Sequence, residues 1–216
     1  TSETGYIQRK LIKAMEDLKV YHNLSVRNAA GNIVQFLYGE DGMDYGKIES
    51  QKLSHFESNF MRLKNDHMFS NDEDFTLFMT KRAINQMKTN KKWNDKLNAY
   101  FGLIQNDVHH LRTYIFPGYR DTTIAFPVNL NRIIYNMKNK CSILSNMLSD
   151  LNPCYVIDQI NNLIQKLSAS TIIKGTDLFA ILLRCYLSPK MVIKSHRLTK
   201  LAFDHIGVKL EFSGEG

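Results

Sequence analysis

Apolar residues recur every three or four positions along most of the chain, which is the spacing of one face of a helix. The opening segment is the clearest case, because at about 100° per residue Ile7, Leu11 and Met15 fall on one side of a helix. The other side carries an aromatic residue and three cations: Tyr6, Arg9, Lys10 and Lys13. We therefore expect a long amphipathic helix at the start of the chain, within residues 1–21.

The same spacing predicts helices over residues 48–63, 75–88, 94–112, 153–167 and 177–187, and another that starts near Asn129. Two proline-containing pairs indicate helix starts. In Asn152-Pro153 the asparagine would be the cap and the proline the first helical residue, and Ser188-Pro189 has the same pattern. We expect Gly207 to end the last helix.

Two short segments favour extended structure. Residues 32–38 are rich in branched and aromatic side chains and run into Gly39 and Gly42, as a strand before a turn would. Residues 124–128 contain Pro127, and the residue before a proline avoids the helical region. The predicted fold class is mainly α, a helical domain with minor β elements near 32–38 and 124–128, preceded by the long amphipathic helix.

Composition and cysteine spacing narrow the class of protein. With 44% apolar and 23% charged residues, the chain has the composition of a globular fold rather than a disordered one. Its longest apolar run, Leu178–Leu183, is far shorter than the roughly 20 residues of a membrane-spanning helix. Cys141, Cys154 and Cys185 form no close pair, which favours a reducing compartment. Lacking an initial Met, the chain is expected to be a piece of a longer protein.

Charge is unevenly distributed around a formal net value of +7. Residues 81–96 hold six basic side chains against Asp95 alone, and residues 184–200 hold five with no acid. Residues 57–74 hold five acids against two cations. The two basic runs fit a stand-alone helical module that binds nucleic acid, but their scattered charges favour ordinary solvated or protein-docking faces.

The sequence contains no complete active site. The acids of residues 72–74 are expected to cap a helix, and those of residues 40–44 to form a turn. The adjacent His109 and His110 would point about 100° apart on a helix, so they could not share one zinc ion. Phosphate-binding loops, nucleophile elbows and nucleophile–base patterns are absent, so we predict no catalytic residue and no metal site.

The cationic side of the first helix is the one pattern with a sharper interpretation. Cations and an aromatic ring on one helical face suit a phosphate backbone, although a merely solvated face has the same composition. The alternatives stay open on residue patterns alone.

Several segments carry a specific resemblance. Residues 1–17 (TSETGYIQRKLIKAMED), Arg27-Asn28, Gly31-Asn32 and residues 35–44 (QFLYGEDGMD) closely resemble the largest subunit of multisubunit DNA-directed RNA polymerase, of the RNA polymerase II type. Residues 126–136 (FPVNLNRIIYN) and 198–204 (LTKLAFD) agree with it in order. Residues 47–123 and 139–174 are assigned by position only.

The resemblance implies that residues 1–21 are the C-terminal part of the bridge helix and residues 22–207 the foot domain. Thr1 and Ser2 match positions nearest the active centre, and Tyr6, Arg9 and Lys10 match positions that approach template DNA. Lys13 joins them on the same helical face. Gly5 would be a flexible point in a bending helix or a site of close packing, two readings that stay open.

Other expectations follow from the same resemblance. The family's metal-binding aspartates and trigger loop lie outside these residues, so the whole enzyme would use Mg²⁺ while this chain alone holds no cofactor and does not polymerise RNA. The expected partners are other polymerase subunits, template DNA and transcription or RNA-processing factors on the foot, without a membrane. The location would be the nucleus, or the viral factory and virion if the source is a large DNA virus, which the Asn- and Lys-rich middle suggests. Residues 208–216 depart from the family pattern as a tail whose native status stays open.

Overall fold

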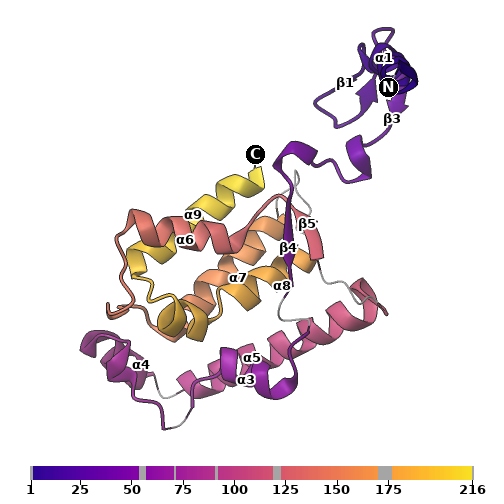
Figure 1. Ribbon diagram of the computed structural model, residues 1–216. Helices are drawn as coiled ribbons and strands as arrows, with labels where there is room; N and C mark the ends of the chain where they lie inside the picture. The colour runs from indigo at the N-terminus through magenta and orange to yellow at the C-terminus, as the bar shows by residue number, and fades with distance from the viewer. Residues whose placement is uncertain are drawn as a thin grey trace. The chain divides into compact units, whose positions relative to one another are not determined.

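The computed structural model describes residues 2–53, 57–70, 72–90, 92–118, 123–169 and 177–215 (Figure 1). The chain forms two compact units, Thr1–Glu49 and Ser50–Gly216. Its described part is mainly helical with two small sheets, which confirms the predicted fold class. None of the helices among these residues is both long and apolar enough to cross a bilayer.

Unit 1 combines one helix with a small antiparallel sheet. Helix α1, Ser2–Met15, has no buried residue. The strands β1 (Lys19–Val20), β2 (Val26–Arg27) and β3 (Ile33–Gln35) pair in the order β1-β2-β3. The opening helix therefore ends well before residue 21, because the chain turns after Met15 and enters β1. The strand predicted within residues 32–38 is present as β3, followed by the 3-10 helix η1, Tyr38–Glu40, where Gly39 has a φ of 61°.

The second 3-10 helix of unit 1 begins at a capped turn. In η2, Tyr45–Lys47, the Asp44 carboxylate accepts a hydrogen bond from the Gly46 amide at 2.9 Å. Asp41 accepts one from the Met43 amide at 2.9 Å. Residues 40–44 thus form the predicted turn, and Asp41 and Asp44 accept hydrogen bonds within it.

Unit 2 is helical apart from one two-stranded sheet, which joins β4 (Glu49–Lys52) and β5 (Thr123–Phe126). Its helical elements are α3 (Phe60–His67), η3 (Phe75–Leu77), α4 (Lys81–Thr89), α5 (Trp93–His110), the π-helix η4 (Leu111–Ile115), α6 (Leu130–Lys140), α7 (Pro153–Ala169), α8 (Asp177–Tyr186), the π-helix η5 (Met191–Ser195) and α9 (Lys200–Glu215).

The helix predicted over residues 48–63 is wrong in its first part. Residues Glu49–Lys52 form β4 instead, with side chains that alternate between half-buried and exposed. The Gln51 amide donates hydrogen bonds to the carbonyls of Phe126 and Val128, at 3.3 and 2.9 Å, so a distant strand selects this conformation. Helix α3 begins only after Asn59, whose side chain caps the Arg62 amide at 2.9 Å. Phe56, part of the predicted stripe, lies outside the described residues.

Most other helix predictions are confirmed, with two corrections. The helix expected over residues 75–88 is split, because Asp74 caps the short η3 and Thr80 then caps a separate α4. Gly207 does not end the last helix, since α9 continues to Glu215. The continuation is held by burial, because Ile206 and Leu210, one turn apart, are both fully buried.

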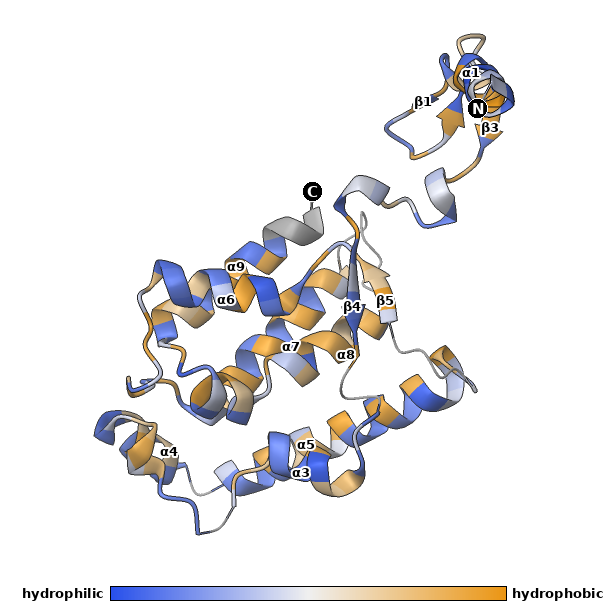
Figure 2. Cartoon of the chain, in the orientation of Figure 1, coloured by the Kyte–Doolittle hydropathy of each residue, from blue (hydrophilic) through white to orange (hydrophobic). Residues whose placement is uncertain are grey.

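The core of unit 2 lies between α5, α6, α7, α8 and α9, where α7 packs against α5, α8 and α9 and α6 packs against α8 and α9. Figure 2 shows apolar positions gathered along α7 and α8, inside this arrangement. One fully buried residue on each of four helices forms its centre: Ile104, Ile134, Ile160 and Leu183. The predicted apolar stripe of residues 156–167 is therefore the core face of α7.

Candidate functional site

The predicted nucleic-acid face lies on α1. Tyr6, Arg9, Lys10 and Lys13 are all exposed, and they fall within an arc of about 100° at the helical repeat. The Lys10 amine lies 4.6 Å from the centre of the Tyr6 ring, a cation–π contact between neighbours one turn apart. Lys13 pairs with Glu16 at 3.0 Å, which offsets part of its charge. Arg9 and the Tyr6–Lys10 pair are therefore the groups of this face best suited to contact a phosphate backbone.

The remaining bridge-helix positions are described in part. Ser2 is exposed at the first residue of α1, whereas Thr1 lies outside the described residues. Gly5 has open space where a side chain would begin, with nothing within 4 Å. Close packing against the described part of this chain therefore does not explain that glycine.

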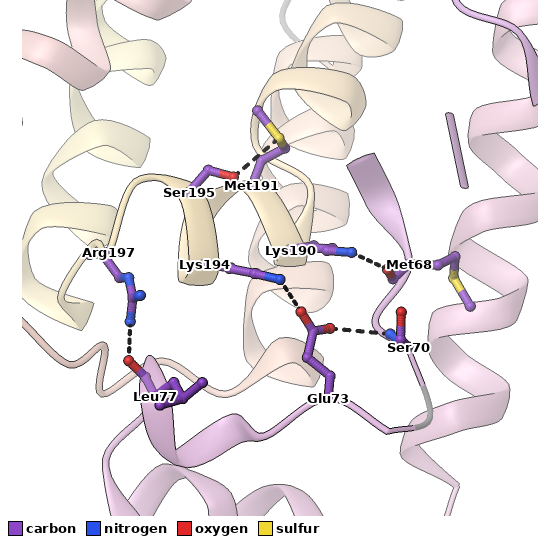
Figure 3. A network of polar contacts seen from close by, with 9 residues as sticks. All are labelled: Met68, Ser70, Glu73, Leu77, Lys190, Met191, Lys194, Ser195 and Arg197. Atoms are coloured by element: carbon purple, nitrogen blue, oxygen red, sulfur yellow. Dashed lines mark hydrogen bonds and ion pairs between the residues drawn. The ribbon is translucent and has the colours of Figure 1, made fainter. Parts of the chain in front are cut away.

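The basic run of residues 184–200 is used inside unit 2 (Figure 3). Lys190 donates to the Met68 carbonyl at 2.6 Å, Lys194 forms an ion pair with Glu73, and Arg197 donates to the Leu77 carbonyl at 2.7 Å. These three side chains reach from η5 and the residues beside it to the segment 68–77. Burial lowers the pKa of the Lys190 amine. The run is thus a set of internal tethers rather than a free cationic face.

Glu73 is the acceptor at the centre of that network. One carboxylate oxygen takes the Lys194 amine and the other accepts a hydrogen bond from the Ser70 amide at 3.1 Å. The neighbouring Asp74 accepts from the Thr76 amide at 2.9 Å and from its hydroxyl at 2.6 Å. These hydrogen bonds hold the pKa of Asp74 below its usual value. The predicted capping role of these acids is confirmed for Asp74.

The other basic run is different. Lys81, Arg82, Lys88 and Lys92 are exposed, and within the described residues they make no ion pair. Among the cations of this run that the structure describes, Lys96 alone is in an ion pair, with Asp158 at 2.6 Å. The structure therefore separates two runs that look alike in the sequence.

A second polar contact joins α5 to α8. Arg184 donates to both carboxylate oxygens of Asp107, one of them at 2.8 Å, and the Tyr100 hydroxyl donates to the Arg184 carbonyl at 3.0 Å. Burial alone would lower the pKa of the Arg184 guanidinium, but Asp107 raises it overall. Burial raises the pKa of the adjacent Cys185 thiol to about 12. A thiol this resistant to ionisation is a poor nucleophile.

A pocket of about 230 Å³ lies between α7 and α9. Apolar residues such as Leu163 and Phe203 line it. Two pairs of polar residues also line it. The Tyr155 hydroxyl donates to Asp204 at 2.8 Å, and Lys166 forms an ion pair with Glu211 at 2.6 Å. Lys166 is paired with Glu211, and Asp204 accepts the Tyr155 hydrogen bond, so each charged side chain of the lining already has a partner and we assign none of them to a reaction.

Metal-ligating residues do not converge in the described part of the chain, where no group of three or more His, Cys, Asp or Glu side chains could hold an ion. His109 is exposed at the end of α5, and the His110 ring stacks at 5.1 Å on that of Tyr114. His109 is therefore a surface residue and His110 a half-buried one.

Sequence reasoning missed the tethers of Figure 3 and the Arg184–Asp107 pair. The sequence does contain a signal for the tethers, because the acid-rich run over residues 57–74 is complementary in charge to the base-rich run over residues 184–200. In the sequence the two runs look like separate surface patches, because spacing along the chain does not reveal which distant segments are in contact. For the second contact the sequence offers no signal beyond a lone Asp on a predicted helix.

The chain was compared with models of known protein families. Residues 43–212 match the family model described as RNA polymerase Rpb1, domain 6. The match covers nearly all of unit 2 and leaves α1 outside it. The chain belongs to the Rpb1 family, the largest subunits of DNA-directed RNA polymerase.

Proposed function

We propose that the chain is the end of a bridge helix joined to a foot domain, with residues 1–21 in the first part, 22–207 in the second and 208–216 as a tail. The observation that carries the foot assignment is the family match over residues 43–212. The bridge-helix assignment rests on the resemblance of residues 1–17 and on the cationic face of α1. Rpb1 proteins work in DNA-templated transcription and assemble with other polymerase subunits.

The exposed apolar side of α1 supports this assignment. Ile7, Leu11 and Met15 are each more than half exposed, and a 14-residue helix without buried residues is marginal on its own. Such a face is expected on a helix whose packing partners belong to a larger assembly. In that assembly the opposite side, with Tyr6, Arg9 and Lys10, would lie beside template DNA and neutralise its phosphates.

The foot is proposed to be structural and non-catalytic. Phosphoryl transfer to a nucleotide 3′ hydroxyl requires carboxylates that converge on Mg²⁺, and the tightest acidic cluster here is already used. Glu73 is paired with Lys194, and Asp74 caps η3. The foot would instead support the cleft and offer docking surfaces to subunits, transcription factors or RNA-processing factors, in the nucleus or in a viral factory.

Photo-crosslinking in the complete polymerase tests the placement of α1. A photoreactive phenylalanine replaces Tyr6 in one enzyme and Tyr135 in another, because the two tyrosines have nearly equal exposure at 60% and 64%. We expect a template-strand adduct from position 6 and none from position 135 in a stalled elongation complex. Adducts from position 6 to protein alone would contradict the proposed DNA contact.

A primer-extension assay with the isolated chain tests the non-catalytic role. Template, primer, nucleotides and Mg²⁺ are expected to yield no product. Template-dependent product that survives the purification of the chain would overturn the assignment of roles.

A further inference from the structure

The four free cations on and after α4 form a surface that the proposed bridge-helix and foot roles do not use. We call Lys81, Arg82, Lys88 and Lys92 the α4 basic face. Lys81 and Lys88 are seven residues apart, so they lie on one side of the helix and about 10 Å apart along its axis. Arg82 lies about 100° around the helix from Lys81.

Acids do little to offset this charge. Helix α4 contains no acidic residue, and the nearest acid in sequence, Asp95, stands in the first turn of α5, where a carboxylate stabilises the helix N-terminus. Glu73 is engaged by Lys194 and Asp158 by Lys96. The Asp74 carboxylate is held by Thr76. The carboxylates of Glu73, Asp74 and Asp158 are therefore directed to other groups.

The composition of the exposed side is as informative as its charge. All three apolar residues of α4, Ala83, Ile84 and Met87, are buried against the rest of unit 2. The outward positions that accompany the cations are polar and uncharged: Asn85, Gln86 and Thr89. Lys, Arg, Asn, Gln and Thr are the side chains that contact phosphate and sugar groups of nucleic acids.

We propose that the α4 basic face binds the phosphate backbone of nucleic acid, as a second contact independent of the α1 face. An acidic protein segment is the other partner with the right charge. Protein interfaces, however, take their affinity from buried apolar or aromatic anchors at the centre of the contact, and α4 offers none, because its apolar residues Ala83, Ile84 and Met87 are all buried. Phosphate contacts need no such anchor, because release of condensed counterions supplies the free energy.

The absence of exposed aromatic residues on α4 also defines the kind of binding. Base stacking on aromatic rings is what gives single-strand binding proteins much of their affinity. A face built from cations and amides tracks the backbone without reading bases. We therefore expect binding that is independent of sequence and steeply dependent on salt.

The test uses fluorescence anisotropy of labelled duplex and single-stranded oligonucleotides with the full chain. The α4 variant K81Q/R82Q/K88Q is compared with the unchanged chain and with K47Q/K64Q/K140Q, which removes three exposed lysines elsewhere. We expect the α4 variant to bind about tenfold more weakly at low salt and to lower the slope of log affinity against log salt by about 2–3, since each phosphate contact contributes about 0.7–0.9. The control triple should keep both values. Circular dichroism confirms that each variant is folded.

A third variant, R9Q/K10Q/K13Q, separates this inference from the proposed role of α1. If that variant keeps full affinity while the α4 variant loses it, the α4 contact stands although the α1 contact fails. Equal losses in the α4 variant and in the control triple would overturn the inference, because net charge alone would then explain binding. Displacement of the oligonucleotide from the α4 face by poly-glutamate at equal charge concentration would also overturn it, in favour of an acidic protein partner.

Discussion

Arg184 on α8 and Asp107 on α5 form a largely buried ion pair, with side chains only 18% and 13% exposed. Two hydrogen bonds join them, one of 2.8 Å between Nη2 and Oδ1. Removing one partner of such a pair leaves the other charge without compensation in a low dielectric. The pair therefore matters more for stability than the exposed pairs of the same unit.

We predict that Asp107→Ala lowers the free energy of unfolding by roughly 3 kcal/mol, the lower end of the range for breaking a buried pair. The matched control is Asp158→Ala, because the Asp158 side chain is 56% exposed in its pair with Lys96, and its cost should be at most about 1 kcal/mol. Urea unfolding of both variants measures the difference. Equal costs would show that the Arg184 contact is no stronger than a surface pair.

The Glu73 network should control the stability of a local segment. Glu73→Gln removes the charge that faces Lys194, so we predict that the amides of residues 72–79 exchange about five- to thirty-fold faster, as expected for about 1–2 kcal/mol. Asp72→Asn, at the neighbouring exposed position, removes the same charge but leaves the Glu73–Lys194 pair in place, so it should leave exchange unchanged. Faster exchange in both variants would point to net charge rather than to the tether.

Two glycines of unit 2 should respond in opposite ways to the same substitution. Gly207 lies inside α9 and Gly118 has a φ of +73°, and neither would place a new Cβ within 4 Å of another group. Gly207→Ala should therefore stabilise the chain by about 0.5–1 kcal/mol through helix propensity. Gly118→Ala should destabilise it by about 1 kcal/mol or more, because left-handed backbone is strained with a side chain. Thermal unfolding distinguishes these signs, and a loss at Gly207 would contradict the open space beside α9.

The buried Cys185 thiol should make the stability of the chain depend on pH above about 9. Burial raises the pKa of its thiol to about 12 from the usual 9.0, so the folded chain keeps the proton while the unfolded chain loses it. Stability from this group should therefore fall as the pH rises from about 9 to about 12, by at most about 1.4 kcal/mol per pH unit. Cys185→Ser should reduce that slope, whereas Cys141→Ser, at a half-buried position, should not. Identical slopes in the two variants would contradict this assignment.

Helix α1 should be the least protected helix in the isolated chain. It buries no residue, while α7 buries seven, so its amides should exchange rapidly and those of α7 slowly. Hydrogen exchange by mass spectrometry measures both in one experiment. Uniform protection of α1 and α7 in a dilute monomer would contradict the expectation that its packing partners lie in a larger assembly.

Local sequence signals predicted the features that neighbouring residues control. Asn129 caps α6 and Asn152 caps the start of α7, as their positions before a helical pattern indicated. The stripe of α7 became its buried face because a helical repeat places those side chains on one side whatever the rest of the fold does. Signals of this kind depend only on residues within one or two helical turns of each other, so they can be read from the sequence alone.

The features that sequence reasoning missed depend on contacts between distant segments. Residues Glu49–Lys52 form a strand because β5 lies beside them, some 75 residues away at Gln51 and Phe126. Lys194 pairs with Glu73, which is 121 residues away in the sequence, so cations of the basic run on α8 and η5 bind groups within unit 2 instead of a partner. The sequence by itself determined that this chain has basic and acidic runs and where helices with a local cap, such as α6 and α7, begin. Only the tertiary structure decided which cations remain free to meet a partner, because charge is neutralised by proximity in space and not by proximity along the chain.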